Sequence, residues 1–226
     1  NYFFYEVGYR LSRNNGVYDS DTGLEKLAYY ADQFGLSDKS GVEISESAPK
    51  VSDFDAIRSA IGQGTNNYST VGLARYVTTV ANSGNCYNLS LLSKATDADG
   101  NLIADYTPTL RNTVDLKQST WDAIHQGMRK VVEDKDYYKD LTIQVAGKTG
   151  TAQENRKRAN HALFVCYAPY EQPQIAIATR IAFGYASDYA AQVTKDIVKY
   201  YFKLEDESSL ITGTAESTNV VQSAGD

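Results

Sequence analysis

Lys148-Thr149-Gly150-Thr151-Ala152-Gln153 is the stretch that decides the fold of this chain. It follows an apolar run over 141–146 that is rich in residues with strand propensity, and Gly147 joins the two. The pattern predicts a strand over 141–153 that ends in a fixed cation, two hydroxyls and a glycine. Such a set suits a site that holds a carboxylate-bearing peptide beside an acyl-transfer nucleophile.

The alternation of side chains along a strand gives these residues separate tasks. Thr149 and Thr151 share a face, so that both hydroxyls meet one carboxylate, and Gly150 lets a ligand backbone lie close to the strand. Lys148 supplies the cation near the reacting centre, and the backbone N–H of Thr151 is a candidate oxyanion donor. A lone Lys-Thr-Gly triplet is a weak motif, and its alternative is an ordinary turn.

The residues that follow predict an antiparallel sheet with a closing helix. Runs over 161–167 and 174–181 predict two further strands, and 187–202 predicts an amphipathic helix packed on one face of the sheet. The apolar set of this helix is Ala190, Ala191, Val193, Ile197, Val198 and Tyr201. The unpaired edge of the sheet is expected to be completed by residues outside this chain or by a ligand strand.

The residues before 141 are predicted to be mainly helix and loop, which makes the fold class α+β. Two extended pieces flank a turn at 97–100. Helices are expected over 2–11, 21–34, 54–60, 71–82 and 119–132, with caps at Asp21-Thr22, at Ser52 or Asp53, at Ser69-Thr70 and at Ser119-Thr120.

Composition argues against several features of this chain, among them nucleic-acid binding and a membrane-spanning segment. The chain has 226 residues, a net charge of -6 and no basic block, which argues against a nucleic-acid partner. It has no apolar stretch long enough to span a membrane and no signal peptide. Cys86 and Cys166 are expected to be buried free thiols, although a disulfide is an alternative. No metal or other cofactor is expected.

The sequence contains two histidines, and neither is expected to act in catalysis or metal binding. His125 is expected to pack beside Trp121, and His161 to be a hydrogen-bonded structural residue rather than part of a cleft. Two histidines with no metal-type cysteine spacing argue against a zinc site or a histidine-based triad. The run Arg156-Lys157-Arg158 is expected to be solvated, although it borders the key strand.

Several segments match one known family in order. They are Asn1-Tyr-Phe-Phe4, 34–44, Ile61-Gly-Gln-Gly64, 68–74, 81–84, Lys148 to Gln153 and 162–169. Together they resemble the C-terminal two-thirds of a penicillin-binding transpeptidase domain, most closely the monofunctional class B type. The resemblance covers about 1–203, and it departs at Val71, where the family usually has proline.

The resemblance implies a fold and a division of the chain. The fold would be that of penicillin-binding proteins and serine β-lactamases, here with about three strands of its antiparallel sheet and a C-terminal helix. The C-terminal portion of the transpeptidase domain would fill 1–203, with the mainly helical lobe at 1–140 and the strands and closing helix at 141–203. The remainder, 204–226, would be a flexible tail.

The resemblance also implies an activity. The parent protein would be a peptidoglycan D,D-transpeptidase that works through an acyl-enzyme and is blocked by β-lactams. Asn1 would hydrogen-bond the motif lysine and the substrate carbonyl, and Lys148 would provide the electrostatics of proton transfer. Thr149, Gly150 and Thr151 would bind the substrate, which would lie antiparallel to the strand.

Partners would be stem peptides, β-lactams and membrane glycosyltransferase, divisome or elongasome proteins. The domain would lie on the extracytoplasmic face of the bacterial membrane, anchored by an N-terminal helix outside this chain.

The family's nucleophile is the serine of an S-x-x-K motif upstream of Asn1, so it is expected to lie outside this chain. The chain contains one such string, Ser47-Ala-Pro-Lys50. Pro49 is tolerated only in a first helical turn, Glu43 and Glu46 add negative charge, and the string follows Asn1 rather than preceding it. It is therefore expected to be a surface loop.

Two other functions remain open from the sequence. One is a β-lactam or peptide sensor, or an inactive scaffold, with the same fold. The other is a carboxypeptidase or β-lactamase, although these usually lack the Ile-Gly-Gln-Gly segment and the long helical lobe. An S-x-x-K motif upstream would favour the enzyme, and its absence would favour the scaffold.

Overall fold

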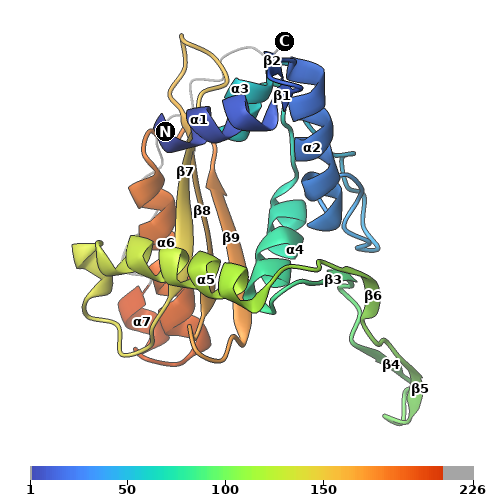
Figure 1. Cartoon of the computed structure of the whole chain (residues 1–226). Coiled ribbons are helices and arrows are strands. Elements are labelled where there is room, and N and C mark those ends of the chain that lie inside the picture. The colour runs from blue at the N-terminus through green and yellow to red at the C-terminus, as the bar shows by residue number, and fades with distance from the viewer. Residues whose placement is uncertain (1, 211–226) are drawn as a thin grey trace.

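The computed structural model describes residues 2–210. A cluster of short helices at the N-terminal end lies above a three-stranded sheet that has helices on both faces, and a narrow arm projects to one side (Figure 1). In chain order the elements are α1 (Tyr2–Leu11), β1 (Arg13–Asn14), β2 (Val17–Tyr18), α2 (Ser20–Gln33), α3 (Ala56–Ala60), α4 (Thr70–Ala81), β3 (Asn85–Asn88), β4 (Lys94–Thr96), β5 (Leu102–Asp105), β6 (Thr109–Thr113), α5 (Gln118–Glu133), the 3₁₀ helix η1 (Asp136–Tyr138), β7 (Ala146–Ala152), β8 (His161–Ala168), β9 (Ile175–Ile181), α6 (Ser187–Tyr201) and α7 (Glu207–Leu210).

The sheet that carries the Lys-Thr-Gly stretch has the strand order β7-β8-β9 and is antiparallel throughout, which confirms the prediction. Its register places Ala146 opposite Tyr167 and Ala152 opposite His161. Because β7 is first in this order, one of its edges has no strand beside it among residues 2–210. The key stretch therefore lies on an edge strand.

The first strand begins later than predicted. β7 starts at Ala146, and residues 141–145 lie outside the sheet. The neighbouring strand β8 ends at Ala168, and Pro169 has no backbone N–H with which to continue the ladder. Leu141 and Ile143 instead pack against the hydrophobic core without a ladder partner. Apolar residues in this segment thus indicate burial rather than strand.

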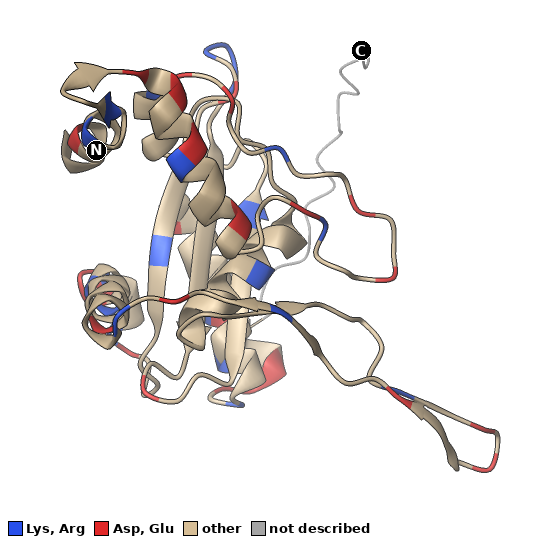
Figure 2. Cartoon of the chain, turned by 45° about the vertical axis from the view of Figure 1, so that its right-hand side comes forward, with Lys and Arg blue, Asp and Glu red and all other residues tan. Residues whose placement is uncertain are grey.

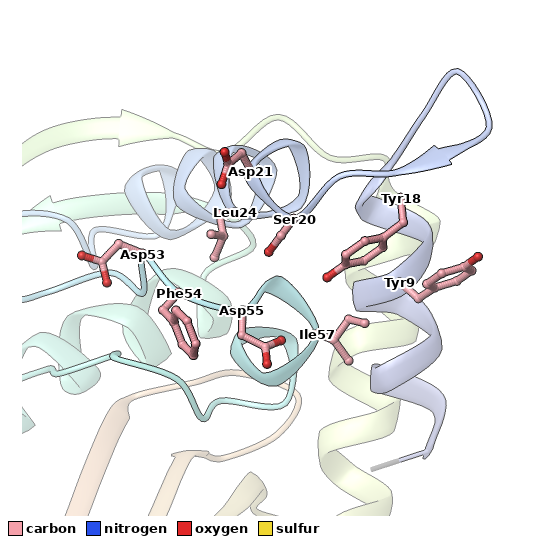
Figure 3. Close-up of a pocket in the computed structure, with 9 residues that line it drawn as sticks. All are labelled: Tyr9, Tyr18, Ser20, Asp21, Leu24, Asp53, Phe54, Asp55 and Ile57. Atoms are coloured by element: carbon pink, nitrogen blue, oxygen red, sulfur yellow. The ribbon is translucent and has the colours of Figure 1, made fainter.

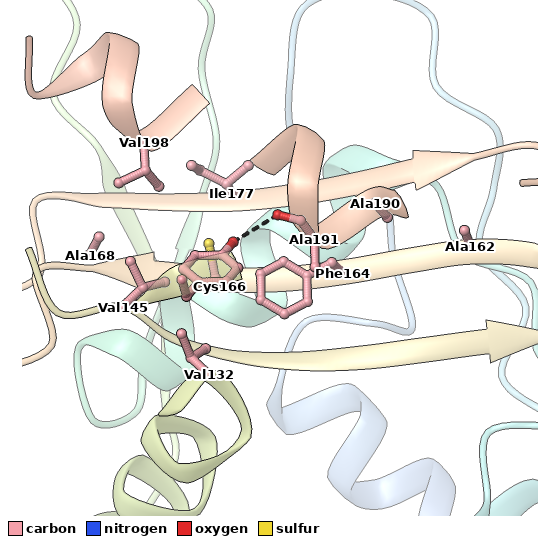
Figure 4. Packing of buried hydrophobic residues seen from close by; sticks show 11 residues of the cluster. Val132, Val145, Ala162, Phe164, Cys166, Ala168, Ile177, Ala190, Ala191 and Val198 are labelled. Carbon is pink, nitrogen blue, oxygen red and sulfur yellow. Dashed lines mark hydrogen bonds between the residues drawn. The ribbon is translucent and has the colours of Figure 1, made fainter. Parts of the chain in front are cut away.

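Helices cover both faces of the sheet. On one face α6 packs over β8 and β9, with small residues at the closest approach (Figure 4). The buried cluster there is Val132, Tyr138, Val145, Ala162, Phe164, Cys166, Ala168, Ile177, Ala190, Ala191 and Val198. The hydroxyl of Tyr138 donates to the carbonyl oxygen of Ala191 at 2.8 Å, which ties η1 to α6. On the other face, Val77, Val80 and Met128 from α4 and α5 pack against Ala146 and Tyr167.

The predicted apolar face of α6 is only partly buried. Ala190, Ala191 and Val198 are buried as predicted, and the other three members of the set are not. Val193, Ile197 and Tyr201 remain 45%, 38% and 48% exposed. They lie beside the buried stripe, and the three described strands contact only part of the helix surface.

The N-terminal helices pack closely because glycines stand where they cross. A Cβ atom on Gly8 of α1 would lie 2.8 Å from Cβ of Ala60 in α3. A Cβ atom on Gly23 of α2 would lie 2.8 Å from Cβ of Ala56. These distances are shorter than van der Waals contact, so glycine is required for this arrangement.

Residues 85–113 form a feature that the sequence did not predict. The extended pieces pair as two antiparallel ribbons, β3 with β6 and β4 with β5, and they project as an arm (Figure 1). The five helices expected before 141 are all present, so the feature that the sequence did not predict is the pairing of the extended pieces. Apolar patterning is weak here because both faces of the outer ribbon are exposed, with Leu102 and Ile103 at 60% and 68%.

The helix caps agree with the prediction at one helix and differ at three. Ser69 caps α4 as predicted, since its hydroxyl accepts the N–H of Gly72. Asp19 rather than Asp21-Thr22 caps α2, and Asp55 rather than Ser52 or Asp53 caps α3. At α5 the cap position is Lys117, which makes no side-chain capping bond.

Other features of the chain bear on earlier expectations. Cys86 and Cys166 are buried free thiols, as predicted, and burial raises the pKa of Cys166. In the described part of the chain, no helix is long and apolar enough to cross a membrane. The predicted tail begins with Leu204 and includes the short helix α7, while 211–226 lie outside the described residues.

Candidate active site

The predicted substrate-binding residues lie together in the middle and second half of β7. Pleating places Lys148 and Gly150 on one face of the strand and Thr149 and Thr151 on the other. Thr149 is opposite Phe164, which packs toward α6, so the two hydroxyls lie on the α6 face. The residues meet at the free edge of the strand, where a ligand would contact both faces.

The backbone groups of Thr149 and Thr151 point to this free edge. In an antiparallel strand the N–H and C=O groups of successive residues point to opposite sides. The carbonyl oxygen of Val145 accepts from Arg129 of α5 at 3.0 Å, away from β8. The carbonyl oxygen of Thr149 accepts from Nζ of Lys148 at 2.7 Å. The same alternation turns the N–H and C=O of Thr151 outward, where they are available to pair with an added strand.

Lys148 carries a cation of reduced basicity. The residue keeps contact with solvent, but the surrounding protein desolvates its ammonium group and lowers its pKa. Repulsion from Lys135 lowers the pKa further. An ammonium group of this kind loses its proton more readily than an ordinary lysine, which suits a group beside a proton-transfer step.

The two glycines of β7 differ in what surrounds them. A Cβ atom on Gly147 would lie 2.5 Å from Cζ of Phe164 and 2.9 Å from the carbonyl oxygen of Val165, so packing requires glycine there. A Cβ atom on Gly150 would meet only Cβ of Leu163, at an ordinary 3.5 Å. Nothing inside the described structure requires glycine at 150, so the space beside it is open to a ligand.

The segment after β7 is tied back by His161, the first residue of β8. Nε2 of His161 lies 2.8 Å from Oε2 of Glu154, which confirms the prediction of a hydrogen-bonded structural histidine. The partner, Glu154, was not predicted. The sequence signal was the hairpin itself, since pairing of Ala152 with His161 brings the two ends of the link together. The exposed run Arg156-Lys157-Arg158 lies in this link, beyond the end of β7 (Figure 2).

The Ser47-x-x-Lys50 string has none of the features of a nucleophile site. Ser47 is exposed, and residues 45–49 form no helix, so the serine and lysine do not share a helical face. Glu46 is engaged nearby, accepting from the hydroxyls of Ser40 and Ser69. The prediction of a surface loop is confirmed, and Asn1 lies outside the described residues.

Other parts of the structure do not compete as the active site. A pocket of about 660 Å³ opens among α1, α2 and α3, lined by residues such as Tyr9, Asp21 and Phe54, and β7 contributes nothing to it (Figure 3). His125 lies near Val80, with Nε2 2.8 Å from its carbonyl oxygen, and packs against Trp121, as predicted. Within residues 2–210, no cluster of three or more His, Cys, Asp or Glu side chains is arranged to hold a metal ion.

An edge strand with the sequence Lys-Thr-Gly-Thr-Ala-Gln, followed by two strands and a closing helix, is typical of one family. A model of the penicillin binding protein transpeptidase domain matches residues 1–199. The chain belongs to this family.

Relatives of this transpeptidase-family chain agree with the assignment. Penicillin-binding protein 2B of Streptococcus pneumoniae is 27% identical over 212 residues, which cover 83% of this chain and 31% of that protein. Peptidoglycan D,D-transpeptidase MrdA of Haemophilus influenzae is 27% identical over 237 residues, which cover 88% of this chain and 34% of that protein. The chain thus spans about a third of the length of these relatives.

Solved transpeptidase structures share the fold. That of penicillin-binding protein 2B from Streptococcus pneumoniae superposes with a TM-score of 0.78 at 24% identity, and covers 90% of this chain and 38% of that one. An imipenem acyl-enzyme complex of penicillin-binding protein A from M. tuberculosis gives a TM-score of 0.75 at 20% identity, and covers 88% of this chain and 44% of that one. The α+β class predicted from the sequence is confirmed.

Proposed function

We propose that this chain is the substrate-binding half of a serine-type peptidoglycan D,D-transpeptidase, which cross-links the cell wall and is a target of β-lactams. The observation that carries the proposal is the free edge of β7. There the outward N–H and C=O groups of Thr149 and Thr151 lie next to the Lys148 ammonium group. An extended peptide adds to such an edge as a further antiparallel strand.

In this proposal four residues of β7 have roles in acyl transfer. The hydroxyls of Thr149 and Thr151 bind the terminal carboxylate of the donor peptide, and Gly150 lets the peptide backbone approach. The N–H of Thr151 stabilises the oxyanion that forms when a serine attacks the peptide carbonyl. Lys148 provides the positive charge beside the proton transfer from the serine to the leaving amine.

The reaction runs in two steps. The serine oxygen bonds to the carbonyl carbon of the donor, the peptide C–N bond breaks, and the terminal residue leaves as an amine that carries the serine's proton. The amine of an acceptor peptide then attacks the ester, which transfers the acyl group and returns a proton to the serine. The serine belongs to an S-x-x-K segment outside these 226 residues, and Asn1 would bridge its lysine and the substrate.

The remaining roles also rest on the relatives. Penicillin-binding protein A forms an acyl-enzyme with imipenem, and we propose that the parent of this chain reacts with β-lactams in the same way. The expected substrates are peptidoglycan stem peptides. The expected setting is the extracytoplasmic face of the membrane, beside membrane glycosyltransferase and divisome or elongasome proteins.

A fluorescent penicillin tests the proposal. The natural protein that contains these residues together with an S-x-x-K segment is expected to be labelled stoichiometrically at that serine. The 226-residue chain alone is expected to remain unlabelled, because Ser47 lies on an exposed loop. Labelling of the isolated chain would point to Ser47 as a nucleophile. A natural protein with the motif that resists labelling would favour the inactive scaffold.

A further inference from the structure

The end of β7 is fastened by a junction of three segments that meet at His161. This residue is the first of β8 and is only 8% exposed. It pairs with Ala152, the last residue of β7, so it closes the hairpin directly after Thr151. The other two segments are the link over 153–160 and the turn over 182–186 that leads into α6.

The hydrogen bonds of His161 assign its tautomer. The backbone N–H of Phe183 donates to Nδ1 at 3.2 Å, so Nδ1 carries a lone pair rather than a proton. The ring proton is therefore on Nε2, which donates to Oε2 of Glu154 at 2.8 Å. Nη2 of Arg180 lies 3.4 Å from both ring nitrogens. The Nε2–H tautomer matches both the bond to Glu154 and the bond from Phe183.

The turn that His161 holds has an unfavourable backbone conformation. Phe183 and Tyr185 have φ angles of 54° and 62°, in the left-handed region that residues other than glycine rarely adopt. Such residues persist when surrounding contacts fix them. Here the His161 ring lies 4.8 Å from the Phe183 ring, and the N–H of Tyr185 donates to the carbonyl oxygen of Asn160 at 3.1 Å.

The link over 153–160 is fastened to the same turn from its other end. The guanidinium carbon of Arg158 lies 5.4 Å from the centre of the Phe183 ring, in a cation–π contact. The link therefore contacts this junction at both of its ends. Glu154 makes the contact at the start, and Arg158 and Asn160 make contacts near the end. Removal of His161 would release Glu154 and the N–H of Phe183 together.

We propose that His161 is a positioning residue for the substrate-binding edge. Its contacts would keep the Ala152–His161 pair, the last of the β7–β8 ladder, in place. They would thereby fix the position of the outward N–H of Thr151. β7 has β8 on one side and no strand on the other, among the described residues. The position of the Thr151 N–H therefore depends on the neighbouring Ala152–His161 pair. This role rests on the proposed acyl-transfer function. An oxyanion donor must be fixed before the reaction begins, which is what the junction would provide.

The test compares acylation by fluorescent penicillin in the natural protein and its variants. His161→Ala is expected to lower the acylation rate constant by about tenfold or more, less than the hundredfold or more expected for losing an oxyanion donor outright. The dissociation constant of the non-covalent complex should change less than about threefold. His161→Asn is expected to restore part of the rate, because its carbonyl oxygen replaces Nδ1 as the acceptor for Phe183. Glu154→Ala is expected to lower the rate, with little further loss in the double variant.

A matched control separates positioning from stability. His125→Gln removes a partly buried ring that packs against Tyr167, at the other end of β8 from His161, and it should lower the melting temperature without lowering the acylation rate constant. NMR of the His161 ring nitrogens in the 226-residue chain should show Nε2 protonated and Nδ1 unprotonated.

The outcomes distinguish the two proposals. A wild-type protein with the S-x-x-K motif that is never acylated would overturn the proposed function and this role with it. Normal acylation of the wild type and of His161→Ala at the same rate would overturn the role alone. A protonated Nδ1, or a loss of rate in His125→Gln as large as that in His161→Ala, would also contradict it.

Discussion

Nζ of Lys148 lies 2.7 Å from the carbonyl oxygen of its own neighbour Thr149, at the free edge of β7. That carbonyl would otherwise accept from an added strand. The cation therefore occupies a position that a bound peptide would compete for, and ligand binding would release the ammonium group toward the reacting centre. The lowered pKa of Lys148 fits a group whose environment holds its charge only weakly.

Competitive labelling of amines measures this weakened basicity. Lys148 is expected to react with acetic anhydride faster than Lys139 at the same pH, because a larger fraction of it is unprotonated. Lys139 is the matched control, since it is also exposed and Asp136 raises its pKa. Mass spectrometry of peptides labelled near pH 8 to 9 gives the two rates. Equal rates, or a faster Lys139, would contradict the assignment.

The two glycines of β7 are expected to respond in opposite ways to alanine. Gly147→Ala should lower the free energy of unfolding by about 1–3 kcal/mol, because the new methyl group overlaps Phe164. Gly150→Ala should change it by less than about 1 kcal/mol yet slow acylation, since its methyl group would meet the ligand rather than the protein. Urea denaturation and penicillin labelling give the two quantities. A Gly150→Ala variant with full acylation would exclude close ligand approach at this position.

Arg75 is expected to be a principal stabilising residue of the helical lobe. It is fully buried, and it donates to the carbonyl oxygens of Gly35, Asp38 and Lys39 and to the Asp38 carboxylate. Arg75→Met should lower the free energy of unfolding by about 2–4 kcal/mol, because three carbonyl groups lose a partner. Arg58→Met is the control, since the Arg58–Asp55 ion pair is exposed and is worth less than about 1 kcal/mol. Similar losses in the two variants would refute this assignment.

Asp188 is expected to make stability depend on pH in the acidic range. Hydrogen bonds from Lys135 and then from Tyr137 lower its pKa below the ordinary value of 3.8. Since the folded pKa is lowered, the contribution is present above the ordinary pKa and is lost as the pH falls through the folded value. Asp188→Asn should lower the melting temperature at neutral pH. Between about pH 5 and pH 2, the melting temperature of the variant should fall by less than that of the wild type. Asp99→Asn on the exposed arm is the control, and an unchanged acid profile in Asp188→Asn would contradict the assignment.

The strands of the main sheet, the closing helix and the positions of Lys148, Thr149 and Thr151 on one strand were predictable because their signals are local. Alternation placed Thr149 and Thr151 on one face, and apolar spacing gave α1 and α4 within a residue or two. The start of β7 was not predictable, because Leu141 and Ile143 are as apolar in a core loop as they would be in a strand. Whether they pair depends on where β8 ends, which is a property of another segment.

The arm and the His161 junction were missed for a similar reason. Residues 85–113 show strand-like pieces, but which piece pairs with which is decided by turns and bulges rather than by composition. Glu154 is an ordinary charged residue in the sequence, and only the register of β7 with β8 places it beside His161. Contacts between segments that are each unremarkable are visible only in three dimensions.

The central claim is that the free edge of β7 binds the substrate. A crystal structure of the natural protein acylated by penicillin tests it most directly. The account predicts the ligand carboxylate within hydrogen-bond distance of the hydroxyls of Thr149 and Thr151, and the ligand carbonyl oxygen at the N–H of Thr151. It also predicts that the ligand amide runs antiparallel to β7. A carboxylate bound elsewhere, with Thr149 and Thr151 free of contact, would contradict it.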